Sequence, residues 1–255
     1  MKTIIALILL IISSSGYSQG NFFKLFIEGQ TNDTILNKKE FNLQFKKMIM
    51  DLPKDYSLTP IIFHKDQRND SVFNFVTFKK IWWGNNKIDP KNFEMVYKQD
   101  PLYLFLDKKL PDFDLKDLNG NTFNSKLLIG KPALINFWNM LCRGCILEFP
   151  QLDKLREKYK DRINFIAITT DDSQDSIKKF LLKKPFNFYH LIDGYNYSFK
   201  TLKMSGLPIN LFIDRNGIIR EIKGVLPVEF DKATGTPKVT SNYEFDKILE
   251  KLTKL

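Results

Sequence analysis

Both cysteines of the 255-residue chain lie in one Cys-x-x-Cys turn, Cys142 to Cys145, directly after an apolar run. The run from Ala133 to Trp138 has the composition of a central strand that is buried on both faces. After the cysteines, apolar residues recur at roughly helical spacing, so a helix is expected to begin at this turn. The pattern predicts a redox pair that cycles between dithiol and disulfide.

The expected position of Cys142 at a helix N-terminus favours its thiolate, because unpaired N–H groups and the helix dipole stabilise negative charge there. The thiolate is the form that attacks disulfides, so Cys142 is the candidate nucleophile and Cys145 the candidate resolving thiol. Arg143 adds a positive charge beside Cys142 and is expected to shift the couple toward the oxidising side. Glu148 follows Cys145 by about one helical turn, so we expect its carboxyl to lie near both sulfurs and pass protons.

Three short motifs around this turn carry a family resemblance. They are Asn136-Phe137-Trp138, the cysteine pair, and Glu148-Phe149-Pro150. Together they resemble the active site of secreted TlpA/ResA-like thiol-disulfide oxidoreductases. The resemblance implies an α/β, thioredoxin-like fold with a central mixed sheet flanked by helices. It also implies an acid/base role for Glu148 and no metal or organic cofactor. Two departures are Leu141, where a Trp usually precedes the first cysteine, and Arg143-Gly144, where the pair commonly ends in Pro.

A second motif, Gly206-Leu207-Pro208, stands far along the chain and resembles the Gly-x-Pro strand entry of thioredoxin folds. The resemblance implies a cis bond between Leu207 and Pro208 that faces the cysteines. The backbone of Leu207 is then expected to pair with an extended partner peptide. Leu207, Pro208 and Trp138 are therefore the candidate substrate-binding residues.

The chain is expected to divide into three parts. Residues 1–18 read as a cleaved secretory signal peptide, with a basic start, an apolar core and a small-residue exit, which places the mature protein in the periplasm or outside the cell. An uncleaved anchor is the alternative. Residues 19–104 form an accessory α+β region of unknown role, and residues 105–255 form the thioredoxin-like domain.

Within these parts, strands are expected near residues 22–27, 61–64 and 71–76, and a helix near residues 39–50. Asn119-Gly120 is a hairpin turn signal. Residues 224–240 contain Pro, Gly and Thr, and they are expected to form a long loop whose place relative to the substrate groove the sequence does not determine. His190 stands in no motif and is interpreted as a structural or surface residue.

The net charge of +10 comes from lysines spread along the chain, so a solvated surface is favoured and no nucleic-acid partner is expected. The expected partners are protein thiols and disulfides. The resemblance favours a disulfide reductase of envelope proteins that receives electrons from a membrane thiol donor.

Other readings of the cysteine pair remain open. A thiol peroxidase of the same fold usually has Thr or Ser where this chain has Asn139. Half of a zinc site would need further ligands, and the only histidines are His64 and His190. A structural disulfide, a metal-binding envelope module, or a redox-regulated binding module in residues 19–104 are the remaining alternatives.

Overall fold

The computed structural model describes residues 20–26, 35–52, 56–82, 95–171, 173–230, 234 and 236–254. The chain divides into two compact units, and the boundary falls between Gln99 and Asp100. The signal peptide expected in residues 1–18 lies outside the described residues.

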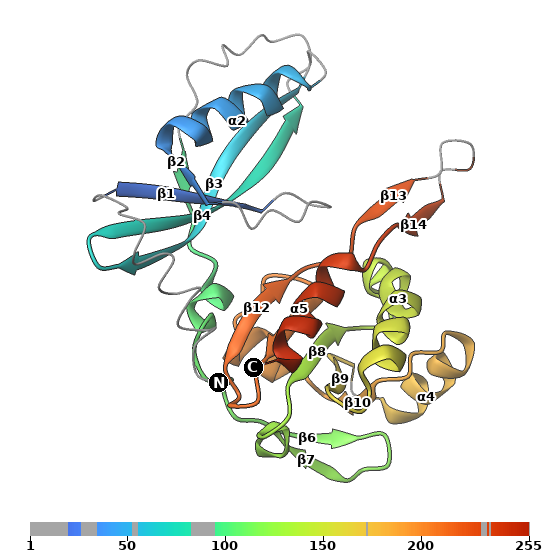
Figure 1. The fold of residues 1–255 in the computed structure, drawn as a ribbon. Helices are drawn as coiled ribbons and strands as arrows, with labels where there is room; N and C mark the ends of the chain where they lie inside the picture. Colours follow the sequence, from blue (N-terminus) through green and yellow to red (C-terminus); the bar gives the residue numbers. More distant parts are fainter. Residues whose placement is uncertain are drawn as a thin grey trace. The chain divides into compact units, whose positions relative to one another are not determined.

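The first unit contains a five-stranded sheet with the strand order β2-β1-β4-β3-β5 and a single described helix, α2 (Figure 1). Its elements are β1 (Gly20–Phe26), β2 (Ile35–Asn37), α2 (Lys38–Met50), β3 (Tyr56–Arg68), β4 (Ser71–Trp82) and β5 (Val96–Tyr97). Helix α2 begins at a capping box between Asn37 and Glu40 and buries Phe41 and Phe45 against the sheet. The strands and the helix expected in this region are confirmed.

The second unit contains a seven-stranded mixed sheet with the order β12-β11-β8-β9-β10-β6-β7 (Figure 1). Strands β8, β9 and β10 are parallel, whereas β11 is antiparallel to both β8 and β12. The elements are η1 (Pro101–Phe105), β6 (Asp114–Asp117), β7 (Thr122–Asn124), η2 (Ser125–Leu128), β8 (Ala133–Trp138), α3 (Arg143–Tyr159), β9 (Asn164–Thr169), α4 (Gln174–Lys183), β10 (Tyr189–Ile192), η3 (Asn196–Thr201), β11 (Ile209–Ile213), β12 (Ile219–Lys223), β13 (Val228–Phe230), β14 (Pro237–Val239) and α5 (Tyr243–Thr253).

Strand β8 lies inside this sheet, between β11 and β9, and every one of its six residues is buried. Leu134 and Trp138 point into a core formed with α3, α4 and α5, whereas Ile135 and Phe137 point into a core formed with η1 and η3. A strand packed on both faces needs apolar residues at successive positions, which explains the continuous apolar run in the sequence. Asn136 is the one polar residue in the strand, and it is fully buried.

Two features of the second unit differ from expectation in detail. Leu102 is buried in its core, and the Tyr103 hydroxyl donates to the carbonyl of Ile222, so η1 packs with this unit, which begins at Asp100 and not at residue 105. Residues 224–240 contain the antiparallel hairpin β13–β14 in place of a long loop. Hairpin pairing satisfies backbone groups that an irregular loop leaves to water.

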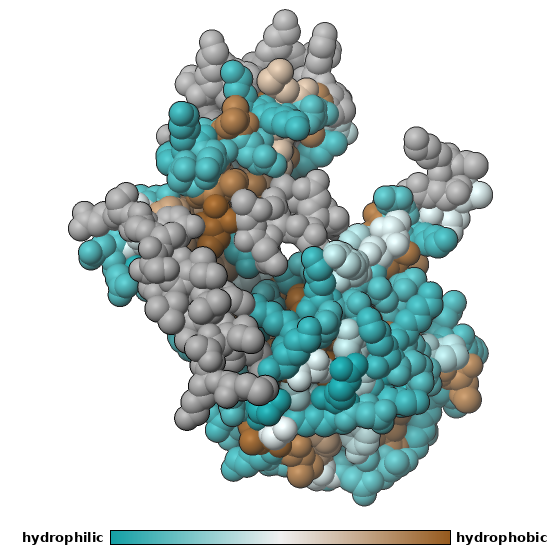
Figure 2. All heavy atoms as spheres, in the orientation of Figure 1, coloured by the Kyte–Doolittle hydropathy of each residue, from teal (hydrophilic) through white to brown (hydrophobic). Residues whose placement is uncertain are grey.

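Hydrophilic residues cover most of the surface of the second unit on the face drawn in Figure 2, and the apolar groups there are small and separate. Within the described ranges, no helix is long and apolar enough to cross a membrane.

Candidate active site

Cys142 and Cys145 form a disulfide at the start of α3. Cys142 is the N-cap residue, and its Sγ accepts the backbone N–H of Cys145 at 3.1 Å. Cys142 is half-buried, whereas Cys145 is fully buried. One sulfur therefore lies within reach of a partner in the positive field of the helix N-terminus, and the other lies beneath it.

The Leu207–Pro208 peptide bond is cis, as the second motif predicts. Residues at this bend lie next to the redox turn, because a methyl group placed on Gly144 would be 3.6 Å from Pro208 Cδ and 3.8 Å from Val225 Cγ2. Pro208 is buried and Leu207 half-buried. The fold thus brings together two motifs that are more than sixty positions apart in the sequence.

Glu148 is fully buried on the inner side of α3 and is surrounded by neutral hydrogen-bond donors. Its Oε1 accepts from Nδ2 of Asn136 at 2.9 Å and from Nδ2 of Asn210 at 3.3 Å. Its Oε2 accepts the backbone N–H of Leu226 at 3.1 Å. Burial raises the pKa of Glu148 to about 7, and these three hydrogen bonds hold it from rising further. A carboxyl with this pKa can both accept and release a proton near neutral pH.

Glu148 and Cys145 are three residues apart on α3, and both are fully buried, so they share the inner face of the helix. Asn136 projects from β8 into the same layer, and its Oδ1 is a buried acceptor without a donor among the described residues. The site therefore combines an accessible sulfur, a buried sulfur and a buried titratable carboxyl.

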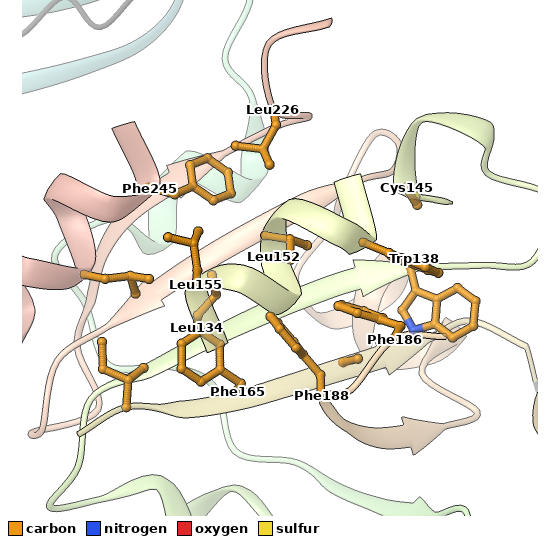
Figure 3. Close-up of a cluster of buried hydrophobic side chains, with 14 of the residues drawn as sticks. Leu134, Trp138, Cys145, Leu152, Leu155, Phe165, Phe186, Phe188, Leu226 and Phe245 are labelled. Carbon is orange, nitrogen blue, oxygen red and sulfur yellow. The ribbon is translucent and has the colours of Figure 1, made fainter. Parts of the chain in front are cut away.

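Trp138 does not lie where substrate contact requires it. The side chain is fully buried, with its ring edge-on to Phe149 at a centroid distance of 5.3 Å and next to Phe180 at 5.7 Å. Figure 3 shows the Trp138 ring in the core beside Phe186. Its burial among aromatic rings gives it a packing role, because β8 directs Trp138 into the core beside Cys145. Leu207 and Pro208 remain the candidate substrate-binding residues.

The chain was compared with known proteins. The AhpC/TSA family matches residues 106–222. Thiol-disulfide oxidoreductase ResA of Bacillus thuringiensis subsp. konkukian is 34% identical over 119 residues, which cover 46% of this chain and 69% of that protein. The chain belongs to the ResA-like thiol-disulfide oxidoreductases. A more distant relative, the thioredoxin-like protein YneN of Bacillus subtilis, is 27% identical over 136 residues, or 51% of this chain and 78% of that protein.

Among solved structures, the thioredoxin domain of a thiol-disulfide oxidoreductase from Bacteroides vulgatus is 20% identical, with a TM-score of 0.48 over 58% of this chain and 97% of that one. The match to the AhpC/TSA family and the identity with ResA confirm the resemblance to ResA-like oxidoreductases, together with the thioredoxin-like fold and the enzyme class. Protein thiols are the substrates that this class implies.

Three residues near the redox centre of this ResA-like chain escaped the sequence analysis. Asn210 and Leu226 bind Glu148, and Asp171 accepts the backbone N–H of Met140 at 2.9 Å, which holds the turn before Cys142. Asn210 had one signal: it is a polar residue in an apolar strand, two positions after Pro208. Leu226 had no such signal, because it donates through its backbone N–H, a group that every residue except proline carries.

His190 is buried beside Trp138, and its Nε2 hydrogen-bonds the carbonyl of Phe186 at 2.7 Å. Burial lowers the pKa of His190, so the neutral ring is favoured. Its partners are core groups, in agreement with the structural role expected for it. Across the described part of the chain, no group of three or more His, Cys, Asp or Glu side chains is arranged to hold a metal ion.

Proposed function

We propose that this oxidoreductase reduces disulfides of proteins outside the cytoplasm, with Cys142 as the nucleophile and Cys145 as the resolving thiol. The observation that carries this proposal is the half-buried Cys142 sulfur at the N-cap of α3, covalently paired with a fully buried Cys145. Only the outer sulfur of such a pair is open to a protein partner, so the order of attack follows from accessibility.

The reaction uses two exchanges of sulfur partners. The Cys142 thiolate attacks one sulfur of a substrate disulfide and forms a mixed disulfide with it, while the substrate S–S bond breaks and the other substrate sulfur leaves as a thiolate. The Cys145 thiol then loses its proton and attacks Cys142 Sγ, which releases the second substrate thiolate and leaves the Cys142–Cys145 disulfide. The substrate gains two electrons and the enzyme loses two, so each turnover needs a thiol donor that returns them.

Glu148 is proposed as the group that takes the Cys145 proton in the second exchange. Its buried position one turn after Cys145 and its pKa of about 7 support this role. The cis bend next to Gly144 supports a docking role for Leu207, whose backbone would pair with an extended substrate segment beside Cys142.

The cellular setting is proposed from the sequence and the family. A cleaved leader in residues 1–18 would deliver the enzyme to the periplasm or the exterior, where disulfides persist. A membrane thiol donor would supply the electrons. Residues 19–99, which precede the thioredoxin-like unit, are proposed to be an accessory module whose role is separate from the chemistry.

Redox equilibration tests the proposed direction. The purified protein is equilibrated in thiol/disulfide buffers of graded potential, and free thiols are counted by alkylation. We expect one two-electron transition below about −260 mV, the lower end of the glutathione range by extraction methods, as a reductant with a dedicated donor requires. A midpoint near about −120 mV would contradict the reductase proposal and favour disulfide introduction.

Arg143→Ala tests the charge beside the nucleophile. Arg143 is exposed, so its field is screened, and we expect the pKa of Cys142 in the reduced enzyme to rise by about half a unit. The pH dependence of Cys142 alkylation in a Cys145→Ser background measures this shift. Arg162→Ala, a change outside α3, is the matched control and should leave the profile unchanged. An equal pKa in the Arg143 variant would exclude the proposed effect.

A further inference from the structure

Asn210 connects three separate elements beneath the redox turn. From β11, its Oδ1 accepts Nδ2 of Asn136 on β8 at 2.9 Å. Its Nδ2 donates to Glu148 on α3 at 3.3 Å and to the carbonyl of Gly224, after β12, at 3.1 Å. The side chain is fully buried, so water cannot replace these partners without a rearrangement.

Residues 224–226 are connected to the Glu148 carboxyl by two hydrogen-bonded routes. The Gly224 carbonyl reaches Glu148 through Asn210, and the Leu226 N–H donates to Glu148 directly. Leu226 is fully buried, whereas Val225 between them is half-buried. Val225 borders the redox turn, because its Cγ2 lies 3.8 Å from the position of a methyl group on Gly144. Residues 224–226 therefore hydrogen-bond to the Glu148 carboxyl, directly and through Asn210, and also line one side of the active site.

The strength of these hydrogen bonds depends on the charge of Glu148. An ionised carboxylate only accepts, and hydrogen bonds to it are roughly twice as strong as those between neutral groups. The groups that act on the Glu148 carboxyl are Asn136 on β8, Asn210 on β11 and the Leu226 N–H, and none of them is charged. Cys145 on its own helix is disulfide-bonded in this form and does not titrate. Protonation of Glu148 therefore weakens its hydrogen bonds to Asn210 and to the Leu226 N–H, and no charged group among those that act on the carboxyl offsets this change.

We propose that Asn210 is a positioning residue that couples Glu148 to residues 224–226, so that this wall of the active site responds to the proton state of the buried acid. The link to catalysis rests on the proton-transfer role proposed for Glu148. A proton that Glu148 takes from Cys145 during turnover would then loosen the segment beside Cys142 at the step in which the substrate leaves.

The test follows backbone amides of the purified disulfide form by NMR between pH 5 and 9. The Val225 amide shares its peptide group with the Gly224 carbonyl, so it reports the Asn210 contact, whereas the Leu226 amide reports Glu148 directly. In the wild-type protein we expect both amides to titrate together with a midpoint near the Glu148 pKa of about 7. Asn210→Ala should reduce the Val225 response at least about five-fold and raise the Leu226 midpoint by about half a pH unit, because a donor to the carboxylate is lost.

Asn210→Leu, which has similar size and no polar atoms, provides the same readout if the alanine variant does not fold. Ser125→Ala, which removes another buried polar side chain of this unit, should leave both titrations unchanged. A Val225 response that persists in the Asn210 variants would overturn the inference. Glu148→Gln separates this inference from the proton-transfer role of Glu148. The variant should abolish the titrations of both amides. If the thiol-disulfide exchange reaction keeps its pH profile in this variant, the catalytic role of Glu148 is wrong, while the coupling through Asn210 stands.

Discussion

Cys142→Ser is expected to abolish reduction of protein disulfides, with a loss of at least about 1000-fold, because a serine hydroxyl without an activating base is a poor nucleophile at neutral pH. Cys142 is the sulfur open to a partner, and the fully buried Cys145 cannot replace it. The measurement is the rate at which the reduced variant cleaves a disulfide-bonded model protein. A residual rate within about ten-fold of wild type would show that Cys145 attacks directly and would reverse the assigned roles.

Cys145→Ser is the matched variant and should behave differently. Its Cys142 still attacks, but no resolving thiol follows, so the mixed disulfide with the substrate should accumulate. Mass spectrometry of the acid-quenched reaction detects this adduct as a one-to-one species that added thiol releases. The same adduct in Cys142→Ser and its absence in Cys145→Ser would contradict the proposed order.

Glu148→Gln is the second change with a large expected effect. Glutamine keeps the size and one acceptor oxygen but cannot take a proton, so we expect the resolving step to slow by about 100-fold at pH 7.5. The wild-type rate should rise as pH passes through about 7, where Glu148 ionises, and the variant should lose this rise. Single-turnover decay of the mixed disulfide as a function of pH measures the step. An unchanged pH profile would exclude Glu148 as the proton acceptor.

The same variant has an expected effect on stability. The folded-state pKa of Glu148, about 7, lies above its ordinary value of 4.5, so between these values the folded form binds more protons than the unfolded form. The free energy of unfolding should therefore fall as pH rises through this window, by about 3 kcal/mol for this group. Urea unfolding of the oxidised protein at pH 5 and pH 8 should show this loss in the wild type and not in Glu148→Gln. Glu157→Gln, an exposed change on the same helix, should retain the wild-type dependence.

Local sequence patterns determined much of the fold and of the chemistry. The apolar run at 133–138 predicted the central strand because a strand buried on both faces tolerates few polar residues. The cysteine spacing predicted the pairing at a helix start, and the Gly-x-Pro motif predicted the cis bond between Leu207 and Pro208. Each of these features depends on residues close together in the chain, so composition and spacing are sufficient to express it.

Tertiary structure alone decided which side chains meet. Trp138 belongs to the core and not to the substrate surface, because alternation along β8 places it on the face covered by α3. Residues 228–230 and 237–239 pair as a hairpin, and Leu226, just before the first of these strands, donates its backbone N–H to Glu148. Asn136, Glu148 and Asn210 come from two strands and a helix and share one buried hydrogen-bond network. Contacts of this kind join distant positions through the register of β8 and β11, and no local spacing in the sequence records that register.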